Sequence, residues 1–311
     1  MISVVLCTYN GEKYIEEQLR SVCEQTTTPD EIIICDDKST DNTLFIVNNL
    51  KKEYCDIRFV IVKNDTNQGV VKNFLNGCQK STGDYIFFCD QDDVWLPEKI
   101  KKTMAKFHEG IDLVFCNAKL VDASLRPKGQ SLWESLHYIP GKKDVLDEML
   151  SRNIFTGMCM AIRRELYENN PAIGDCMLHD EFYGWISVFN NSYAILNEEL
   201  VLYRQHDNNV VGSGNYSQFN SKQEAARRII ESTKRTRDKY EAIQALCNNY
   251  SAFEEIKKAK LFYDFRVDIQ HLRGIGNAIK VIRLAIAGYY NKYTSRTERA
   301  IGKDLYMIIV G

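Results

Sequence analysis

Proline is scarce in this chain, with 5 residues among 311, and only 17 residues are glycine. With 44% apolar and 11% aromatic residues, the composition excludes disordered and collagen-like chains and is typical of a protein with a sizeable core. The sequence has no run of about 18 uncharged apolar residues, and a strand-like segment follows Met1 with no basic region before it. We therefore expect neither a membrane-spanning helix nor a signal peptide, and we place the protein in the cytoplasm.

Paired cysteines and the common phosphate-binding loops are also missing. The ten cysteines form no C-x-x-C pair and stand singly in apolar runs, which favours reduced core residues over disulfides. No G-x-x-x-x-G-K-[ST] segment occurs, and the G-x-G at residues 274–276 follows no strand. Neither the P-loop nor the dinucleotide-binding fingerprint is therefore present.

The net charge of −2 conceals a division along the chain. Residues 1–215 carry 22 basic and 32 acidic side chains, whereas residues 216–311 carry 18 basic and 10 acidic ones. Such a split indicates two roles. The acidic part is suited to bind a cation, and the basic part is suited to contact an anionic surface or partner.

Strand and helix patterns alternate over the first 120 residues. Short apolar runs predict strands at 2–7, 31–35, 59–62, 85–89 and 113–116. The segments between the first four runs repeat apolar residues at helical spacing, as at Ile15, Leu19, Val22 and Cys23. This alternation predicts right-handed βαβ units, and hence an α/β fold with a parallel sheet flanked by helices.

Polar residues follow each of the first four predicted strands, where ligands bind in open α/β sheets. They are Thr8 to Gly11, Asp36 and Asp37, Asn64 to Gly69, and Asp90-Gln91-Asp92-Asp93. Ordinary turn chemistry explains any one of these loops but explains all four together poorly. The acidic segment at 90–93 is the sharpest signal, because two carboxylates leaving a strand can share Mg²⁺ or Mn²⁺ with a diphosphate.

A set of segments in this order resembles glycosyltransferase family 2, most closely its rhamnosyltransferase-like branch in bacterial polysaccharide synthesis. The segments include ISVVLCTYNGEKYIEEQLRSV, EIIICDDKSTDNT, NQGVVKNFLNG, GDYIFFCDQDDVW, TGMCMAIRREL and LVLYRQHDNNVVG. The resemblance implies a GT-A fold, a nucleoside-diphosphate sugar donor, a divalent metal and an inverting transfer. It also implies a catalytic domain over 1–215, with a nucleotide-binding half at 1–117 and an acceptor-side half at 118–215, followed by a basic helical extension at 216–311.

The resemblance also assigns roles to single residues. Thr8, Tyr9 and Asn10 would shape the nucleotide pocket, and Asp36 would contact the base or ribose. Asn67 and Gly69 match a turn beside the nucleotide, where glycine lets the backbone approach a ligand closely. Lys72 stands where relatives commonly have Arg, so a phosphate contact there would be a point charge. Asp90 would bind the ribose or support the metal, and Arg204 would bind the diphosphate.

The metal and the catalytic base follow from the same resemblance. Asp92 would ligate Mg²⁺ or Mn²⁺, with help from Asp90 and His206. Asp180 matches the base that takes the proton from the acceptor hydroxyl, with Glu181 as the alternative. His179 would either orient Asp180 or be purely structural, and Asn208, Asn209 and Gly212 would form a loop closing over the donor.

The donor and the acceptor stay open at this point. The branch favours dTDP-rhamnose and a lipid-linked saccharide acceptor, with a UDP-hexose as the main alternative donor. A sugar nucleotidyltransferase and a non-catalytic nucleotide-sugar binder are the other classes to consider. The first of these needs a Gly-rich N-terminal loop that the sequence lacks, and the intact Asp92 and Asp180 argue against the second. No nucleic acid partner is expected.

The basic extension suggests a surface role. One helical stripe carries apolar and aromatic residues, and Lys280 and Arg283 lie on its opposite side. The stripe consists of Ile275, Ile279, Ile282, Ile286, Tyr289 and Tyr293, and Tyr290 adds a further aromatic ring. A basic amphipathic helix with interfacial tyrosines can lie on an anionic membrane. We therefore predict peripheral attachment to the inner face of the cell membrane. The alternative is that the stripe packs on the catalytic domain or forms a homodimer contact.

Overall fold

The computed structural model describes residues 1–174, 176–206, 222–247, 250–270 and 274–310. Of these residues, 1–140, 155–173 and 178–206 form one compact unit, and the remainder form a second. The second unit includes residues 141–154, which lie inside the predicted 118–215 half. The domain boundary at residue 215 stays a prediction.

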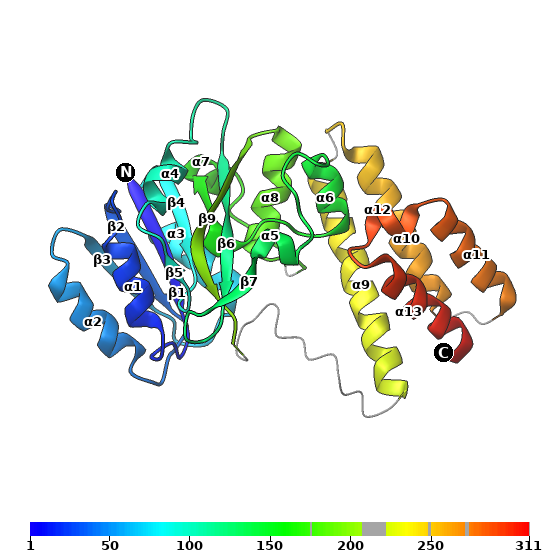
Figure 1. The fold of residues 1–311 in the computed structure, drawn as a ribbon, viewed down its shortest axis with the longest axis horizontal. Helices are drawn as coiled ribbons and strands as arrows, with labels where there is room; N and C mark the ends of the chain where they lie inside the picture. Colours follow the sequence, from blue (N-terminus) through cyan, green and yellow to red (C-terminus); the bar gives the residue numbers. More distant parts are fainter. Residues whose placement is uncertain (175, 207–221, 248–249, 271–273, 311) are drawn as a thin grey trace. The chain divides into compact units, whose positions relative to one another are not determined.

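The first unit is built on a sheet whose nine strands, within the described residues, follow the order β3-β2-β1-β4-β8-β6-β9-β5, with β7 paired to β6 (Figure 1). Its first half is parallel and consists of β1 (Ile2–Thr8), β2 (Glu31–Asp36), β3 (Arg58–Lys63) and β4 (Tyr85–Cys89). These four strands confirm the expected parallel α/β arrangement.

The second half of the sheet is mixed. β8 (Met160–Arg163) runs antiparallel between β4 and β6 (Leu113–Val121), and β9 (Tyr193–Arg204) runs parallel to β6. The short β5 (Val94–Trp95) and β7 (Pro127–Ser131) add antiparallel pairs to β9 and β6. A buried apolar run has the same pattern in either direction, so the sequence did not indicate this reversal.

Helices cover the sheet of the first unit, with α3 (Val70–Lys80) packed on β1 and β2, and α1 (Ile15–Cys23) packed on β5 and on α2 (Thr43–Glu53). α8 (His179–Asn190) contacts α3 and β6. The remaining helical elements of this unit are α4 (Lys99–Met104), α5 (Leu132–Ser135), α7 (Arg164–Asn169) and the 3-10 turn η1 (Gly157–Cys159).

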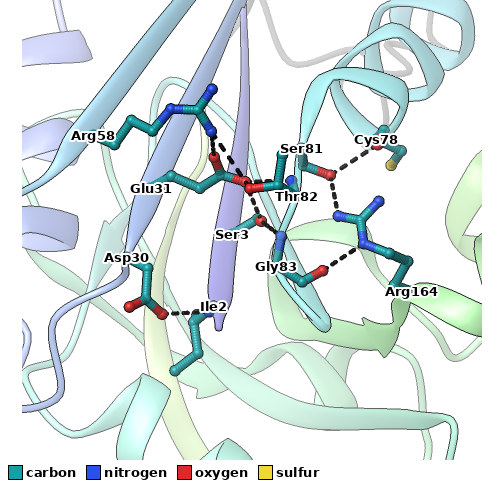
Figure 2. A network of polar contacts seen from close by, with 10 residues as sticks. All are labelled: Ile2, Ser3, Asp30, Glu31, Arg58, Cys78, Ser81, Thr82, Gly83 and Arg164. Atoms are coloured by element: carbon teal, nitrogen blue, oxygen red, sulfur yellow. Dashed lines mark hydrogen bonds and ion pairs between the residues drawn. The ribbon is translucent and has the colours of Figure 1, made fainter.

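A polar network joins the amino ends of the parallel strands (Figure 2). Glu31, fully buried at the start of β2, accepts hydrogen bonds from Ser3 Oγ and from the Thr82 backbone N–H, and it pairs with Arg58 at 2.5 Å. Burial opposes ionisation of Glu31, yet these partners hold the pKa of its carboxyl below the usual value. Side chains therefore tie the amino ends of the parallel strands together. The polar loops lie at the opposite, carboxyl ends.

The second unit is helical. It contains α6 (Val145–Ser151), α9 (Lys222–Leu246), α10 (Phe253–Ile269), α11 (Ile275–Ile286), α12 (Tyr289–Tyr293) and α13 (Thr297–Val310). α6 belongs to this unit because it packs on α12, and because Tyr240 on α9 donates a hydrogen bond to the carbonyl of Leu150.

The core of the second unit corrects the expectation of interfacial tyrosines. Tyr290 is completely buried and packs edge-on against Phe262, while its hydroxyl donates to Asp304 at 2.6 Å. Tyr293 is 2% exposed. Both rings face the interior because α12 packs on α10 and α13. They are therefore core residues.

The structure also bears on the expected absence of disulfides and of membrane-spanning helices. All ten cysteines are free, and eight are buried as predicted, but Cys55 is exposed and Cys176 half-buried. Among the described helices, none combines the length and the apolar character needed to cross a bilayer.

Candidate functional site

The acidic loop after β4 lies next to the carboxyl end of β9. Asp92 Oδ2 lies 2.9 Å from His206 Nε2, and both side chains are largely buried. The His206 ring stacks on Tyr14, with 5.1 Å between the ring centres. The structure thus brings together two residues that stand 114 positions apart in the sequence.

Negative charge accumulates at this loop. Burial, together with the charges of Asp92 and Asp180, raises the pKa of Asp90 to about 7. The neighbouring Asp93 is fully buried and accepts a hydrogen bond from the Arg204 backbone N–H at 2.9 Å, while its other carboxyl oxygen has no hydrogen-bond partner among the described residues. Asp90, Asp92 and Asp180 are therefore close enough for their charges to interact.

Asp180 lies in the first turn of α8 and is 7% exposed. Its carboxyl accepts hydrogen bonds from the backbone N–H groups of Gly157 at 3.1 Å and Glu181 at 2.6 Å. Burial is the main cause that raises the pKa of Asp180 to about 7. A carboxyl with a pKa near neutrality, held by two backbone donors, is suited to act as a general base. Glu181, the alternative base, is also buried.

His179 has a packing role. Its ring lies between Phe74 and Phe88, with centroid distances of 4.1 and 4.8 Å, and both ring nitrogens are buried without a hydrogen-bond partner among the described residues. Burial lowers the pKa of His179 to about 3, so the ring is neutral. A Cβ on Gly157 would lie 2.8 Å from His179 Nε2. The absence of a side chain there lets η1 approach Asp180.

Arg204 connects three segments of the first unit. Its side chain is 2% exposed, and its guanidinium donates to the carbonyls of Asp92 and Ala123 and pairs with Glu17 at 2.7 Å. The group also lies 4.5 Å from the centre of the Tyr14 ring. These contacts fix the backbone of the acidic loop against β9, so Arg204 orders the loop whether or not it also reaches a diphosphate.

The predicted nucleotide residues gather at the ends of β1 and β2. Thr8 Oγ1 donates to Asp36 at 3.0 Å, and both side chains are buried. Tyr9 is 49% exposed, and its backbone N–H and carbonyl both bond to the Gln91 side-chain amide. Asn10, at φ 48°, accepts a hydrogen bond from the Thr40 backbone N–H. Gln91 therefore ties the first loop to the acidic loop, a role not predicted from the sequence.

Asp37 organises the turn that contains Asn67 and Gly69. Its two carboxyl oxygens accept hydrogen bonds from the backbone N–H groups of Gln68 at 2.7 Å and Gly69 at 2.8 Å. Gly69 has φ 80°, a conformation that favours glycine. Asn67 and Lys72 are exposed near this turn. The Asp36-Asp37 pair was a recognisable signal, but the sequence did not show which acid binds the turn.

Sequence reasoning also missed Lys99. This lysine is 1% exposed, and its ammonium has no hydrogen-bond partner among the described residues. The nitrogen lies 3.3 Å from the centre of the Trp95 ring, and Trp95 itself is buried. Burial lowers the pKa of Lys99, while the charge of Lys99 acts to lower the pKa of Asp90. Lys99 therefore places a buried cation near the acidic loop.

The donor set at Asp92 and His206 fits a divalent cation only in part. Carboxylates suit Mg²⁺ and Mn²⁺, and imidazole is a common ligand of divalent transition metals. One carboxyl oxygen of the nearby Asp93 has no hydrogen-bond partner among the described residues. In the described part of the chain, however, no three His, Cys, Asp or Glu side chains form a metal-binding cluster. The protein would therefore supply one or two ligands, and substrate phosphate oxygens the others, as is common for Mg²⁺.

Residues 3–170 match the family model for glycosyl transferase family 2. The chain belongs to glycosyltransferase family 2. One relative in this family, the dTDP-rhamnosyl transferase RfbG of Shigella flexneri, is 34% identical over 229 residues, which are 67% of this chain and 74% of the relative. A Campylobacter jejuni enzyme, GalNAc(5)-diNAcBac-PP-undecaprenol beta-1,3-glucosyltransferase, is 28% identical over 65% of this chain and 64% of its own length.

Solved structures share the fold. TarS 1-349 of S. aureus, crystallised with UDP-GlcNAc, superposes with a TM-score of 0.59 at 20% identity and covers 99% of this chain and 81% of its own. The mannosyltransferase PcManGT of Pyrobaculum calidifontis, crystallised with GDP-Man and Mn²⁺, gives 0.54 at 16% identity, with 99% and 84% covered. The chain is thus a glycosyltransferase with a GT-A fold. Asn208, Asn209 and Gly212 lie outside the described residues.

Proposed function

We propose that this enzyme transfers rhamnose from dTDP-rhamnose to a lipid-linked saccharide during bacterial surface polysaccharide synthesis, with inversion at the anomeric carbon. The observation that carries the proposal is that a candidate base, Asp180, lies near the acidic loop. Asp180 has a pKa raised to about 7 and sits close enough to Asp90 for their charges to interact. Inversion by a single displacement needs one such base on the side of the anomeric carbon opposite the leaving diphosphate.

The residues divide the chemistry between the two reacting ends. Asp180 is held by the N–H groups of Gly157 and Glu181. It would take the proton of the acceptor hydroxyl while the hydroxyl oxygen attacks the anomeric carbon. Asp92 and His206 would hold Mg²⁺ or Mn²⁺. When bound, the cation offsets the negative charge that develops on the leaving diphosphate. Arg204 would keep the acidic loop in register by binding the carbonyl of Asp92.

The nucleotide would lie over the ends of β1 and β2. Asp36, which accepts a hydrogen bond from Thr8, would contact the ribose or base, and the exposed Tyr9 would contact a ring. Gly69 and Asn67 would border the nucleotide, and the exposed Lys72 would reach a phosphate as a point charge.

The choice of donor and acceptor rests on relatives. The rhamnosyl donor is supported by the Shigella flexneri enzyme at 34% identity, and a lipid-linked acceptor by the Campylobacter jejuni enzyme, whose name specifies an undecaprenol-linked saccharide. A UDP-hexose is the second candidate donor, supported by the fold shared with TarS, which was crystallised with UDP-GlcNAc.

A panel of nucleotide sugars tests the proposal. Thermal unfolding would be followed with dTDP-rhamnose, UDP-glucose, UDP-GlcNAc and GDP-mannose, each with and without Mn²⁺. At a 100-fold excess over Kd, the true donor should stabilise the protein by about 2.7 kcal/mol, and only with the cation. Product analysis with that donor and a lipid-linked acceptor would follow. Stabilisation by a UDP-sugar alone would replace the rhamnose assignment, and stabilisation without turnover would indicate a binding protein.

A further inference from the structure

An exposed apolar row runs along α11 in the second unit. The exposed fractions of Ile275, Ile279, Ile282 and Ile286 are 82, 44, 48 and 83%. Their spacing of four, three and four residues places them on one face of the helix, while Val281 is the buried residue of this helix. Four isoleucines of one helix are therefore left in water, which is the kind of apolar patch that marks an interaction surface.

A hollow with basic residues in its wall borders another face of the same helix. It has a volume of about 420 Å³, lies between α10, α11 and α12, and includes Leu261, Phe265 and Leu284 in its wall. Lys258, Lys280 and Arg283 contribute its cations. Lys258 pairs with Glu255 at 2.7 Å, but Lys280 and Arg283 make no ion pair with any described residue. The helix thus carries an exposed apolar row on one face and, on another face, two cations that have no ion pair among the described residues.

We infer that this surface, defined by the four isoleucines with Lys280 and Arg283, docks on an anionic lipid bilayer. The isoleucines would enter the acyl boundary, and the two cations would contact acidic headgroups. The charge of the surroundings agrees, because residues 271–311 carry 7 basic and 2 acidic side chains. A second copy of the chain fits less well, since a two-fold contact across α11 would bring like charges together.

The inference deepens the proposed function, because a lipid-linked acceptor would be found at a bilayer, but its test needs neither donor nor acceptor. The full chain would be floated with phosphatidylglycerol-containing vesicles and with pure phosphatidylcholine vesicles at low salt. We expect binding to the anionic vesicles, partial release by high salt, and little binding to the zwitterionic ones. Equal binding to both, or to neither, would overturn the inference.

Paired variants separate the two contributions. Ile279→Gln with Ile282→Gln should weaken vesicle binding roughly 100-fold, because burying each isoleucine contributes about tenfold. Lys280→Gln with Arg283→Gln should cost roughly fivefold per charge on anionic vesicles only. The first unit offers a matched control for each pair. Phe45→Gln, at a side chain that is 68% exposed, is the control for the isoleucines. Lys51→Gln with Lys52→Gln, both exposed on α2, is the control for the cations. Circular dichroism would confirm folding.

The oligomeric state provides the decisive alternative outcome. Light scattering of the wild type should show no association that depends on the apolar row. A dimer that is split by Ile279→Gln with Ile282→Gln, combined with no vesicle binding, would assign the surface to a protein contact. Retained donor stabilisation in these variants would show that the proposed function stands even if the membrane inference fails.

Discussion

The ammonium group of Lys99 lies 3.3 Å from the centre of the Trp95 ring, inside the protein and near the acidic loop. The face of the indole ring offsets part of the cost of burying this charge. The charge in turn acts against the burial and the neighbouring carboxylates that raise the pKa of Asp90. A residue with no predicted role thus influences the protonation of the loop proposed to face the donor.

Replacement of Lys99 by Met tests this influence. The side chain keeps its length while the charge is lost, so the pKa of Asp90 should rise further. Donor binding that depends on Mn²⁺ should then require a higher pH. Titration calorimetry at pH values from about 6 to about 8, on either side of the pKa of Asp90, would measure this shift. Lys101→Met, at an exposed position of the same helix, is the control. Superimposable pH profiles for wild type and Lys99→Met would remove Lys99 from the electrostatics of the site.

The rate of transfer should depend on pH through Asp180. A general base must be ionised, and the pKa of Asp180 is raised to about 7, so kcat should fall as the pH drops below that value. Asp180→Asn should lower kcat by at least ~100-fold with little change in donor affinity. Steady-state kinetics from acidic to alkaline pH would measure both. An inactive Glu181→Gln beside an active Asp180→Asn would reverse the assignment.

Removal of either proposed metal ligand should uncouple the protein from divalent cations. Asp92→Asn and His206→Gln each remove one side of the 2.9 Å contact, and each should reduce Mn²⁺-dependent turnover by more than the roughly 10- to 100-fold typical of outer-shell partners. His108→Gln, at an exposed histidine, should behave like the wild type. Full activity of the wild type in EDTA would contradict the metal assignment.

Close packing beneath α8 predicts a stability effect. A Cβ on Gly184 would lie 2.3 Å from the Phe155 ring, so Gly184→Ala should lower the free energy of unfolding by about 1–3 kcal/mol. Urea denaturation would measure this loss. Phe155→Leu should make the added methyl less harmful in the double variant. At Gly276, in α11, an added Cβ meets nothing within 4 Å, so Gly276→Ala is the control without a clash. It should keep or slightly raise the stability, because alanine favours a helix more than glycine does.

The sequence predicted the local elements better than their partners. The run Tyr85–Cys89 was placed correctly because a buried strand has a distinctive apolar pattern. The antiparallel β8 and the position of α6 in the second unit were not predicted, since both depend on contacts between distant segments. The acidic loop was found because its residues are adjacent. The Arg204–Glu17 pair spans 187 residues and leaves no local signal. Tyr290 was misplaced because helical periodicity does not show which face is covered.

The hydrogen bond from the backbone of Arg204 to Asp93 has a consequence for how the protein is made. The two residues are 111 positions apart, and a ribosome adding roughly 5–20 residues per second needs on the order of ten seconds to cover that distance. During this interval the nascent chain already holds β4 and the acidic loop, but it lacks the end of β9 whose backbone bonds Asp93 in that loop. The edge of β4 that pairs with β8 is likewise open until residues 160–163 have been added, so translation speed between these two codons should influence the yield of folded enzyme.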